Sequence, residues 1–190
     1  MLKLLKPALI IFLSFALLTG ILYPLAITGI AQVIFPRQAN GSLITSNGKV
    51  VGSALIGQQF TDPKYFWGRL SDTGSTPYDA SNSAGSNYSV LNPSLLTEAQ
   101  ARLKALHDAD PTNTQPVPVD LVTSSGSGLD PHISIAAAQY QAPRVARLRG
   151  LALDKVMALI AQNTQGRMLG FLGEPTVNVL ELNLALDAIK

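Results

Sequence analysis

Residues 8 to 35 read ALIIFLSFALLTGILYPLAITGIAQVIF, a run of 28 residues without a charged side chain. The hydrocarbon core of a bilayer takes about 20 residues of helix, so this run is long enough to cross a membrane with tilt or overhang. Lys3 and Lys6 precede the run, and only Arg37 lies just after it. Because basic residues favour the cytoplasmic side, the pattern places the N-terminus in the cytoplasm and the bulk of the chain outside.

The expected organisation is a short cytoplasmic segment at residues 1–7, a transmembrane helix at 8–35 and an extracytoplasmic domain at 36–190. A cleaved secretory signal is the alternative, since Gly29 and Ala31 are small residues that could mimic a cleavage site. The apolar part of a signal usually spans about 7 to 15 residues, roughly half the length of this run. A retained anchor is therefore the favoured interpretation.

Three residues inside the run favour packing against a second helix. Gly20 and Gly29 allow close approach of another helix, and a kink at Pro24 is tolerated where neighbours satisfy the backbone. Ordinary transmembrane composition is the alternative, because membrane helices are richer in Gly and Pro than soluble ones. A partner helix and membrane lipid are the expected surroundings.

The rest of the chain is balanced in charge. With Lys3 and Lys6 set aside, 12 Lys and Arg stand against 12 Asp and Glu, which gives no reason to expect nucleic-acid binding. The chain has no cysteine, so disulfides and thiolate metal sites are excluded. The expected fold class is α+β, with the N-terminal transmembrane helix followed by one compact domain of mixed helices and strands.

Local patterns predict the first elements of that domain. An Asn-Gly pair at 47–48 between two β-branched stretches predicts a hairpin within 43–56. Residues 71–93 are rich in Ser, Asn and Gly and predict a long loop attached through Tyr78 and Tyr88. A solvated loop and a contact surface are both open interpretations of this segment.

Helices and one further strand are expected downstream. Thr97 with Gln100 fits a capping box for a helix that ends at 110–111. Residues 116–122, PVPVDLV, predict a strand with Val119 and Leu121 on one face.

The C-terminal third predicts two helices and an ambiguous tail. Ser134 is suited to cap a helix that Pro143 breaks or kinks, and a second helix is expected from Leu153 until Gly166 closes it. The tail at 178–189 has alternating leucines typical of a strand, but its Leu and Ala content favours a helix.

The loop at 122–134, VTSSGSGLDPHIS, has the residue types of a chemical site. Its candidate residues are Gly126, Ser127, Gly128, Asp130, Pro131 and His132. A phosphate-binding loop needs Lys and a hydroxyl residue after its last glycine, and a dinucleotide loop needs a third glycine; both are missing. Ser125 or Ser127 with His132 and Asp120 has the residue types of a catalytic triad, whose geometry no spacing reports.

An architectural role for this loop is the favoured interpretation. Gly126 and Gly128 permit backbone angles closed to other residues, and Asp130 is suited to accept hydrogen bonds from the following amides. Zinc needs about three protein ligands, whereas Asp130 and His132 supply two. The loop is therefore expected to be structural or an interface, and anion binding at the next helix N-terminus stays as an alternative.

Arg144, Arg147 and Arg149 form a basic stretch with no acid between Ala136 and Leu153. A solvated face is the favoured interpretation, and contact with lipid headgroups or an acidic partner is the alternative.

Five blocks of the chain resemble one known family. They are GSALIGQQFTDPKYFWGR at 52–69, PVDLVTSSGSGLDPHIS at 118–134, RVARLRG at 144–150, GFLGEP at 170–175 and VNVLELNLALD at 177–187. With the N-terminal run, and in this order, they resemble the C subunit of the bacterial potassium-transporting P-type ATPase, the Kdp system. The resemblance covers nearly the whole chain.

This resemblance implies a place in an inner-membrane complex that imports potassium at the cost of ATP. It implies three partners: a channel-like potassium-binding subunit, a catalytic P-type ATPase subunit and a small single-helix subunit. It also implies an accessory role in assembly, and a chaperone-like role that raises the ATP affinity of the catalytic subunit. ATP and potassium belong to the complex, and no cofactor is expected on this chain itself.

The residues agree with an accessory role on one point. The phosphorylated D-K-T-G motif of a P-type pump is absent, and the nearest string is DKV at 154–156, so the chain is not expected to be an enzyme by itself. Leu70 departs from a proline of the family pattern, and Ala84 with Gly85 departs from paired glycines, which leaves the conformation of 69–93 open. The alternative function is an independent membrane-anchored periplasmic hydrolase or solute-binding module that uses the 122–134 loop.

Overall fold

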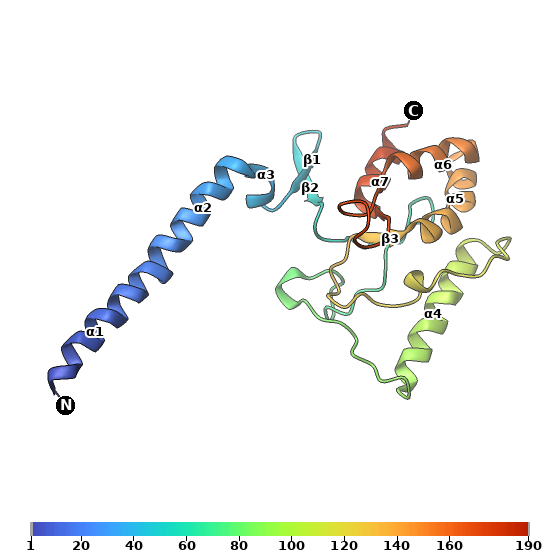
Figure 1. Cartoon of the computed structure of the whole chain (residues 1–190). Coiled ribbons are helices and arrows are strands. Elements are labelled where there is room, and N and C mark those ends of the chain that lie inside the picture. The colour runs from blue at the N-terminus through green and yellow to red at the C-terminus, as the bar shows by residue number, and fades with distance from the viewer. Residues whose placement is uncertain (1, 190) are drawn as a thin grey trace. The chain divides into compact units, whose positions relative to one another are not determined.

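The computed structural model describes residues 2–189 and divides the chain into two compact units, Met1–Val51 and Gly52–Lys190 (Figure 1). The first unit is mainly helical, and the second contains helices and a small sheet. The expected α+β class, with one apolar N-terminal helix before a compact domain, is confirmed.

The first unit begins with a long helical rod. Three consecutive elements form it: α1 (Leu2–Leu17), the π-helical turn η1 (Leu18–Leu22) and α2 (Tyr23–Ile34). Its stretch from Leu4 to Ile34 is 31 residues long and is apolar and long enough to cross a membrane, with none of the apolar window buried. A short helix, α3 (Pro36–Ala39), follows.

Pro24 does not end the rod. Proline has no N–H to donate, so the backbone carbonyl one turn earlier loses its partner. The chain responds with the wider turn η1, in which the Tyr23 N–H donates to the Leu18 carbonyl five residues back. Gly20 and Gly29 face open space, since apart from the helix's own neighbouring backbone no described atom lies within 4 Å of the place that a Cβ would take, and their helix-packing role stays a prediction.

The predicted hairpin is confirmed. β1 (Leu43–Ser46) pairs with β2 (Lys49–Ser53), and the turn lies at Asn47 and Gly48. Both turn residues have positive φ, 50° and 75°, the conformation that favours Asn-Gly in two-residue turns.

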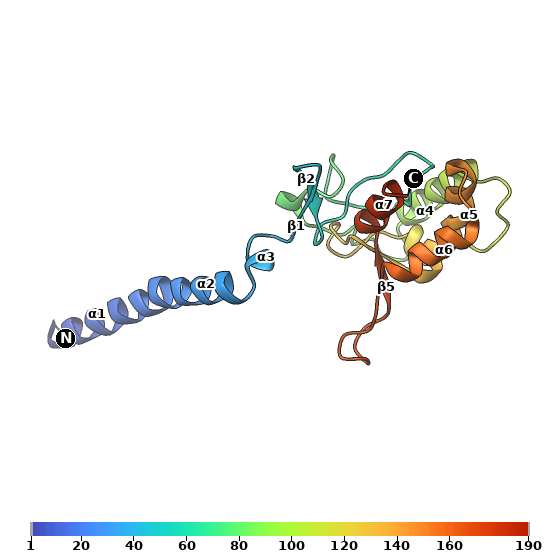
Figure 2. The same ribbon diagram turned by 90° about the horizontal axis from the view of Figure 1, so that it is seen from above.

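The second unit contains a three-stranded antiparallel sheet in the order β3-β5-β4. Its strands are β3 (His132–Ser134), β4 (Thr164–Gln165) and β5 (Thr176–Asn178). Its helices are α4 (Pro93–Ala109), α5 (Ile135–Arg149), α6 (Leu153–Gln162) and α7 (Val179–Asp187), with the short 3-10 turns η2 (Ala80–Asn82) and η3 (Val119–Leu121). Figures 1 and 2 show α5, α6 and α7 gathered beside the sheet.

The core is centred on α5. Small side chains on its inner face let α6 and the sheet approach closely, and larger aliphatic side chains fill the remaining space. The fully buried members include Ala137, Ala142, Val145, Ile133, Val156, Val177, Leu182 and Leu186. Each buried aliphatic side chain stabilises the fold by about 1.5–3 kcal/mol relative to exposure.

The start of α4 differs from the prediction. The helix begins at Pro93, with the Asn92 side chain accepting from the Ser94 N–H at 2.9 Å. Thr97 is already inside the helix, where its hydroxyl donates to the Pro93 carbonyl, so the predicted capping box is wrong. An Asn cap followed by proline at the first helical position is the stronger start signal.

One prediction just before α5 is also wrong. Residues 116–122 do not form a strand: Val119 is 71% exposed, Leu121 is buried, and the segment closes the 3-10 turn η3. Of the break or kink predicted at Pro143, the break is absent, because Pro143 lies inside α5 and the helix continues to Arg149. Pro143 and Gln139 are both exposed, so water can satisfy the Gln139 carbonyl that the proline leaves unpaired.

The C-terminal tail forms a helix, as its composition favoured. The Asn178 side chain caps α7 by accepting from the Glu181 N–H at 3.1 Å. The helix before it, α6, ends at Gln162 rather than at Gly166.

Candidate functional site

Two buried side-chain amides hold the backbone of Phe66 and Trp67. Gln141 of α5 accepts from the Trp67 N–H at 2.8 Å and donates to the Trp67 carbonyl at 3.1 Å. Asn183 of α7 does the same for Phe66, at 2.9 and 3.0 Å. Each amide therefore takes the place that a neighbouring strand would have, and this irregular segment is fixed against two helices.

Two guanidinium groups lie over the Trp67 ring. The Arg144 and Arg102 groups are 4.5 and 5.1 Å from the ring centre, within the range of a cation–π contact. Arg102 also donates to the carbonyls of Gly68 (2.8 Å) and Leu121 (3.0 Å), and burial lowers its pKa below the ordinary value. These contacts join α4 to the segment around Trp67.

Arg144 is buried, which corrects the prediction of a solvated face. Only 2% of it is exposed, and it donates to the carbonyls of Pro63 (2.8 Å) and Tyr65 (3.1 Å). Burial lowers the pKa of Arg144 to about 10. The guanidinium has a structural role, because it satisfies carbonyls that have no strand partner.

The other two arginines of this stretch form ion pairs. Arg147 contacts the buried carboxylate of Asp110 at 2.8 Å, and Arg149 contacts Asp187 at 2.7 Å. The three arginines thus tie α5 to three different parts of the domain, although Arg147 keeps about half of its side chain exposed (49%).

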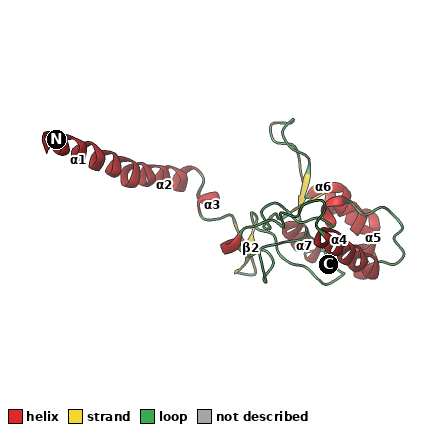
Figure 3. Ribbon diagram, turned by 90° about the horizontal axis from the view of Figure 1, so that it is seen from below, coloured by secondary structure: helices red, strands yellow, loops and turns green. Residues whose placement is uncertain are grey.

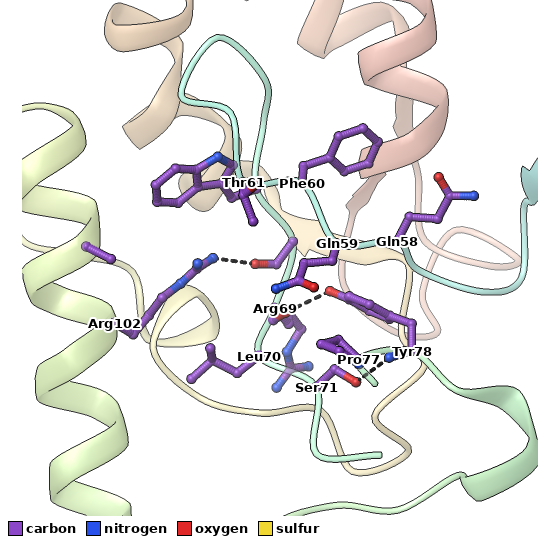
Figure 4. A pocket seen from close by; sticks show the side chains of 13 residues that line it. Gln58, Gln59, Phe60, Thr61, Arg69, Leu70, Ser71, Pro77, Tyr78 and Arg102 are labelled. Carbon is purple, nitrogen blue, oxygen red and sulfur yellow. Dashed lines mark hydrogen bonds between the residues drawn. The ribbon is translucent and has the colours of Figure 1, made fainter. Parts of the chain in front are cut away.

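A cavity of about 360 Å³ lies beside Trp67 (Figure 4). Apolar and polar side chains both line it, among them Phe60, Thr61, Leu70, Arg69, Tyr78 and Arg102. Figure 4 shows the Tyr78 hydroxyl directed at the Arg69 backbone and the Ser71 hydroxyl directed at the Tyr78 N–H. The wall of the cavity is therefore built by hydrogen bonds between side chains and backbone.

Tyr78 attaches the long loop to the domain, as predicted. Its hydroxyl donates to the Arg69 carbonyl at 2.7 Å, and its ring lies against the backbone at Gly57 and Gly68, where a Cβ would come within 2.3 and 2.7 Å of Tyr78 atoms. Burial raises the pKa of Tyr78 to about 12. The second predicted attachment is also present, since the Tyr88 hydroxyl donates to Glu98 of α4 at 2.5 Å.

The 122–134 loop packs against the 69–93 loop, and we call this pair the two-loop layer. The Ser125 N–H donates to the Leu70 carbonyl (3.2 Å), and the Ala84 N–H donates to the Ser127 carbonyl (3.1 Å). The Ser71 hydroxyl donates to the Gly128 carbonyl at 2.6 Å. Backbone of both loops is paired across the layer, which fixes their conformations.

Only one of the two predicted glycines needs its special conformation. Gly128 has a φ of 68°, and a Cβ there would lie 2.5 Å from Thr73 and 2.6 Å from the Ala84 carbonyl. Gly126 has no left-handed φ and open space around its Cα, so the expectation for it is wrong. Instead, Gly85 packs closely against the backbone of Gly126. A Cβ on Gly85 would come within 2.9 Å of the Gly126 carbonyl.

Asp130, Pro131 and His132 connect the layer to the sheet. Asp130 accepts from the His132 N–H at 2.9 Å and from Arg69 at 3.3 Å, and the Pro131 carbonyl accepts from the Val179 N–H at 2.9 Å. Burial alone would raise the pKa of Asp130, but the hydrogen bonds from His132 and the charge of Arg69 lower it below the ordinary value. These residues are thus brought together as a structural joint.

The structure does not assemble the candidate triad. Ser127 accepts from the Leu129 N–H (3.2 Å), and Asp120 accepts from the N–H and hydroxyl of Ser134 (2.7 and 3.1 Å). Ser125 is buried with its hydroxyl unpaired, and no described hydrogen bond joins a serine of this loop to His132. A nucleophile must contact its base, so this arrangement gives no support to triad chemistry. Within residues 2–189, no group of three or more His, Asp or Glu side chains could hold a metal ion.

Sequence reasoning missed the residues that organise this site, chiefly Gln141, Asn183 and Arg102. A usable signal was present for two of them. Gln141 stands among the alanines of α5, and Asn183 stands among the leucines of α7, so each is a polar residue on an apolar face. A buried polar side chain must find partners, which marks such positions as ties to backbone.

A long apolar N-terminal helix and a small α+β domain, whose buried polar groups mainly hold backbone, define the structural class of this protein. The chain matches the family model described as K+-transporting ATPase, c chain, over residues 5–188, and it belongs to this KdpC family.

Relatives of this chain carry the name potassium-transporting ATPase KdpC subunit. The protein from Polaromonas naphthalenivorans is 62% identical over 188 residues, covering 99% of this chain and 96% of the relative. Those from Methylococcus capsulatus and Herpetosiphon aurantiacus are 61% and 60% identical, each over 185 residues, covering 97% of this chain and 97% and 96% of the relatives. The family resemblance expected from the sequence blocks is confirmed.

Proposed function

We propose that this chain is a non-catalytic accessory subunit of an ATP-driven potassium import complex. Its relatives are named as subunits of a potassium-transporting ATPase. The observation that carries the non-catalytic part is the two-loop layer, whose polar groups are bound mainly to backbone. Such a layer holds a shape for a partner to contact and has no nucleophile–base pair.

The proposed placement is that of a single-pass inner-membrane protein. Residues 1–7 would lie in the cytoplasm, 8–35 would cross the membrane and 36–190 would form the periplasmic domain. The apolar helix and the two lysines before its uncharged run at 8–35, Lys3 and Lys6, support this orientation. The proposed partners are the channel-like potassium-binding subunit, the catalytic P-type subunit and the small single-helix subunit.

The proposed contribution to transport is assembly and stabilisation of the complex. A chaperone-like effect on the ATP affinity of the catalytic subunit would act through protein contacts, because the chain lacks the lysine-hydroxyl sequence of a phosphate-binding loop. ATP and potassium would bind elsewhere in the complex.

Two experiments test this proposal. The complex is purified with and without this chain, and potassium-stimulated ATPase activity is measured. Loss of assembly or activity without the chain is expected, and full assembly with full activity would refute the accessory role. Alanine at Ser125, Ser127 and His132 tests the hydrolase alternative, since only an enzyme using this loop would lose turnover while its folding and assembly stay intact.

Because the chain has no cysteine, its membrane topology can be tested with single introduced cysteines. Ser75 is exposed in the domain, so Ser75→Cys should react with a membrane-impermeant maleimide once the outer membrane is permeabilised. Leu4→Cys should react only after the inner membrane is opened. Labelling of Leu4→Cys first would reverse the proposed orientation.

A further inference from the structure

The last residue of β4 and most of the connection to β5 form an exposed loop with an apolar tip, which we call the finger (residues 165–174). All ten of its residues are exposed, and Figures 2 and 3 show it extending away from the rest of the domain. The tip carries four large apolar side chains, Met168, Leu169, Phe171 and Leu172, which are 67%, 78%, 69% and 43% exposed. A contiguous apolar group of this kind on a surface marks an interaction site.

The finger is ordered by its own contacts. Met168 and Leu172 exchange two backbone hydrogen bonds of 2.9 Å, and Arg167 and Glu174 form an ion pair at its base, in which one guanidinium nitrogen donates to both carboxylate oxygens at 2.8 and 2.9 Å. Leu169 and Gly170 have positive φ, 54° and 82°, which closes the turn at the tip. A pre-ordered loop loses little conformational freedom on binding, so it is suited to a defined docking contact.

The chemistry of the finger argues against insertion into lipid. The carbonyls of Leu169, Gly170 and Phe171 accept no hydrogen bond from any described residue, and hydrocarbon could not satisfy them. The charge of Arg167 is balanced by Glu174, which leaves no net positive charge for anionic headgroups. A protein surface can offer both an apolar groove and donors for these carbonyls.

We propose that the finger docks into an apolar groove on another subunit of the same complex, with Leu169 and Phe171 as the buried anchors and the Arg167–Glu174 pair at the rim. This inference rests on the proposed function, because it needs a protein partner. Phe and Met are enriched in interface cores, and charged residues remain at the rim, as in this loop.

Cross-linking from the finger tests its neighbour directly. Met168→Cys introduces the only thiol of the chain and leaves both anchors in place; Val119→Cys, at a 71% exposed position outside the finger, is the matched control. Each is labelled with a thiol-reactive photo-cross-linker in the assembled complex. The expected result is an adduct between the Met168 position and another subunit that the control does not form. An adduct between two copies of this chain, or with lipid alone, would overturn the proposal.

Disruption of the tip tests its contribution to binding. The double variant Leu169→Asn and Phe171→Ser removes both anchors, and asparagine tolerates the positive φ at 169, so the turn is retained. Recovery of partner subunits with the chain should fall by about tenfold or more, as for loss of hot-spot side chains. Val119→Ser should leave recovery unchanged, and both variants should unfold at the wild-type temperature.

The two proposals fail in different ways. If the wild-type chain does not co-purify with the other subunits, the proposed function fails. If the wild-type complex forms and the double variant assembles equally well without a finger adduct, only the docking proposal fails.

Discussion

The side-chain amide of Gln141 bonds both backbone groups of Trp67, a residue 74 positions earlier in the chain. The same oxygen of Gln141 accepts from Arg144 at 2.7 Å, and Arg144 lies over the Trp67 ring. One buried amide therefore connects the cavity wall with the central helix α5. Because Trp67 is the only tryptophan of the chain, its fluorescence reports on this connection.

Replacement of Gln141 should destabilise the domain strongly. Gln141→Leu leaves a buried N–H and carbonyl of Trp67 without partners, and the expected loss is about 2–4 kcal/mol in the free energy of unfolding. Gln139→Leu, two residues away and exposed, should change it by less than about 0.5 kcal/mol. Urea titration of the full-length chain in detergent, followed by Trp67 fluorescence, measures both. Equal stability of the two variants would contradict the role of the amide.

The raised pKa of Tyr78 predicts a loss of stability at alkaline pH. Its pKa is raised to about 12 by burial, whereas an unfolded tyrosine ionises near 10. Above pH 10 the unfolded chain releases this proton while the folded chain keeps it, so stability falls as the pH rises from about 10 towards 12. The contribution is up to about 2 kcal/mol.

Tyr78→Phe should reduce this dependence. The variant loses the hydrogen bond to the Arg69 carbonyl and starts less stable, but its stability should decline less between pH 9 and 11. Denaturation midpoints across that pH range provide the comparison. Parallel pH curves for the two proteins would show that Tyr78 titrates alike in both states.

The two glycines of the 122–134 loop should respond differently to alanine. Gly128→Ala forces a Cβ against Thr73 and the Ala84 carbonyl at a left-handed φ, and it should cost about 2 kcal/mol or more. Gly126→Ala meets no described atom within 4 Å and should stay within about 0.5 kcal/mol of the wild type. Thermal unfolding measures the stability of both variants. An equal change in stability would contradict the role assigned to the close packing of the two loops at Gly128.

Arg144 should not be replaceable by lysine. A single ammonium cannot reach the Pro63 and Tyr65 carbonyls and the Gln141 oxygen together, so Arg144→Lys should cost about 2 kcal/mol or more. Arg147→Lys can keep the ion pair with Asp110 and should cost less than about 1 kcal/mol. The same urea titration measures this difference. If Arg144→Lys left the free energy of unfolding unchanged, the planar guanidinium group would not be needed at this position.

Features set by neighbouring residues were predictable from the sequence. The Asn47–Gly48 turn and the Asn178 cap follow from local backbone preferences, and both are present. The strand at 116–122 was wrong because Asp120 bonds Ser134, a contact across 14 positions that competes with extended structure. The start of α4 is local too, and there the Asn92–Pro93 pair is a stronger signal than Thr97.

The site was predictable only in part. The 122–134 loop was expected to be structural or an interface, which stays a prediction, and its partner, the 69–93 loop, could be identified only as long and polar. The burial of Arg144 depends on carbonyls about 80 positions away, which no periodicity in the arginine stretch reveals. Gln141 and Asn183 likewise act across the chain, at sequence separations of 74 and 117.

The π-helical turn at Leu18–Leu22 adds one residue to a turn of the rod. In an α-helix each residue advances the side-chain direction by about 100°, so this addition rotates everything beyond Pro24 by about that angle relative to an uninterrupted helix. In an uninterrupted α-helix Gly20 and Gly29, nine residues apart, would lie about 180° apart around the axis, and the extra residue changes this angle. A partner helix packed along the first half of the rod would have to wind around it to stay in contact with the second half. Removal of a single residue from the π-helical turn would align the side-chain faces of the two halves again.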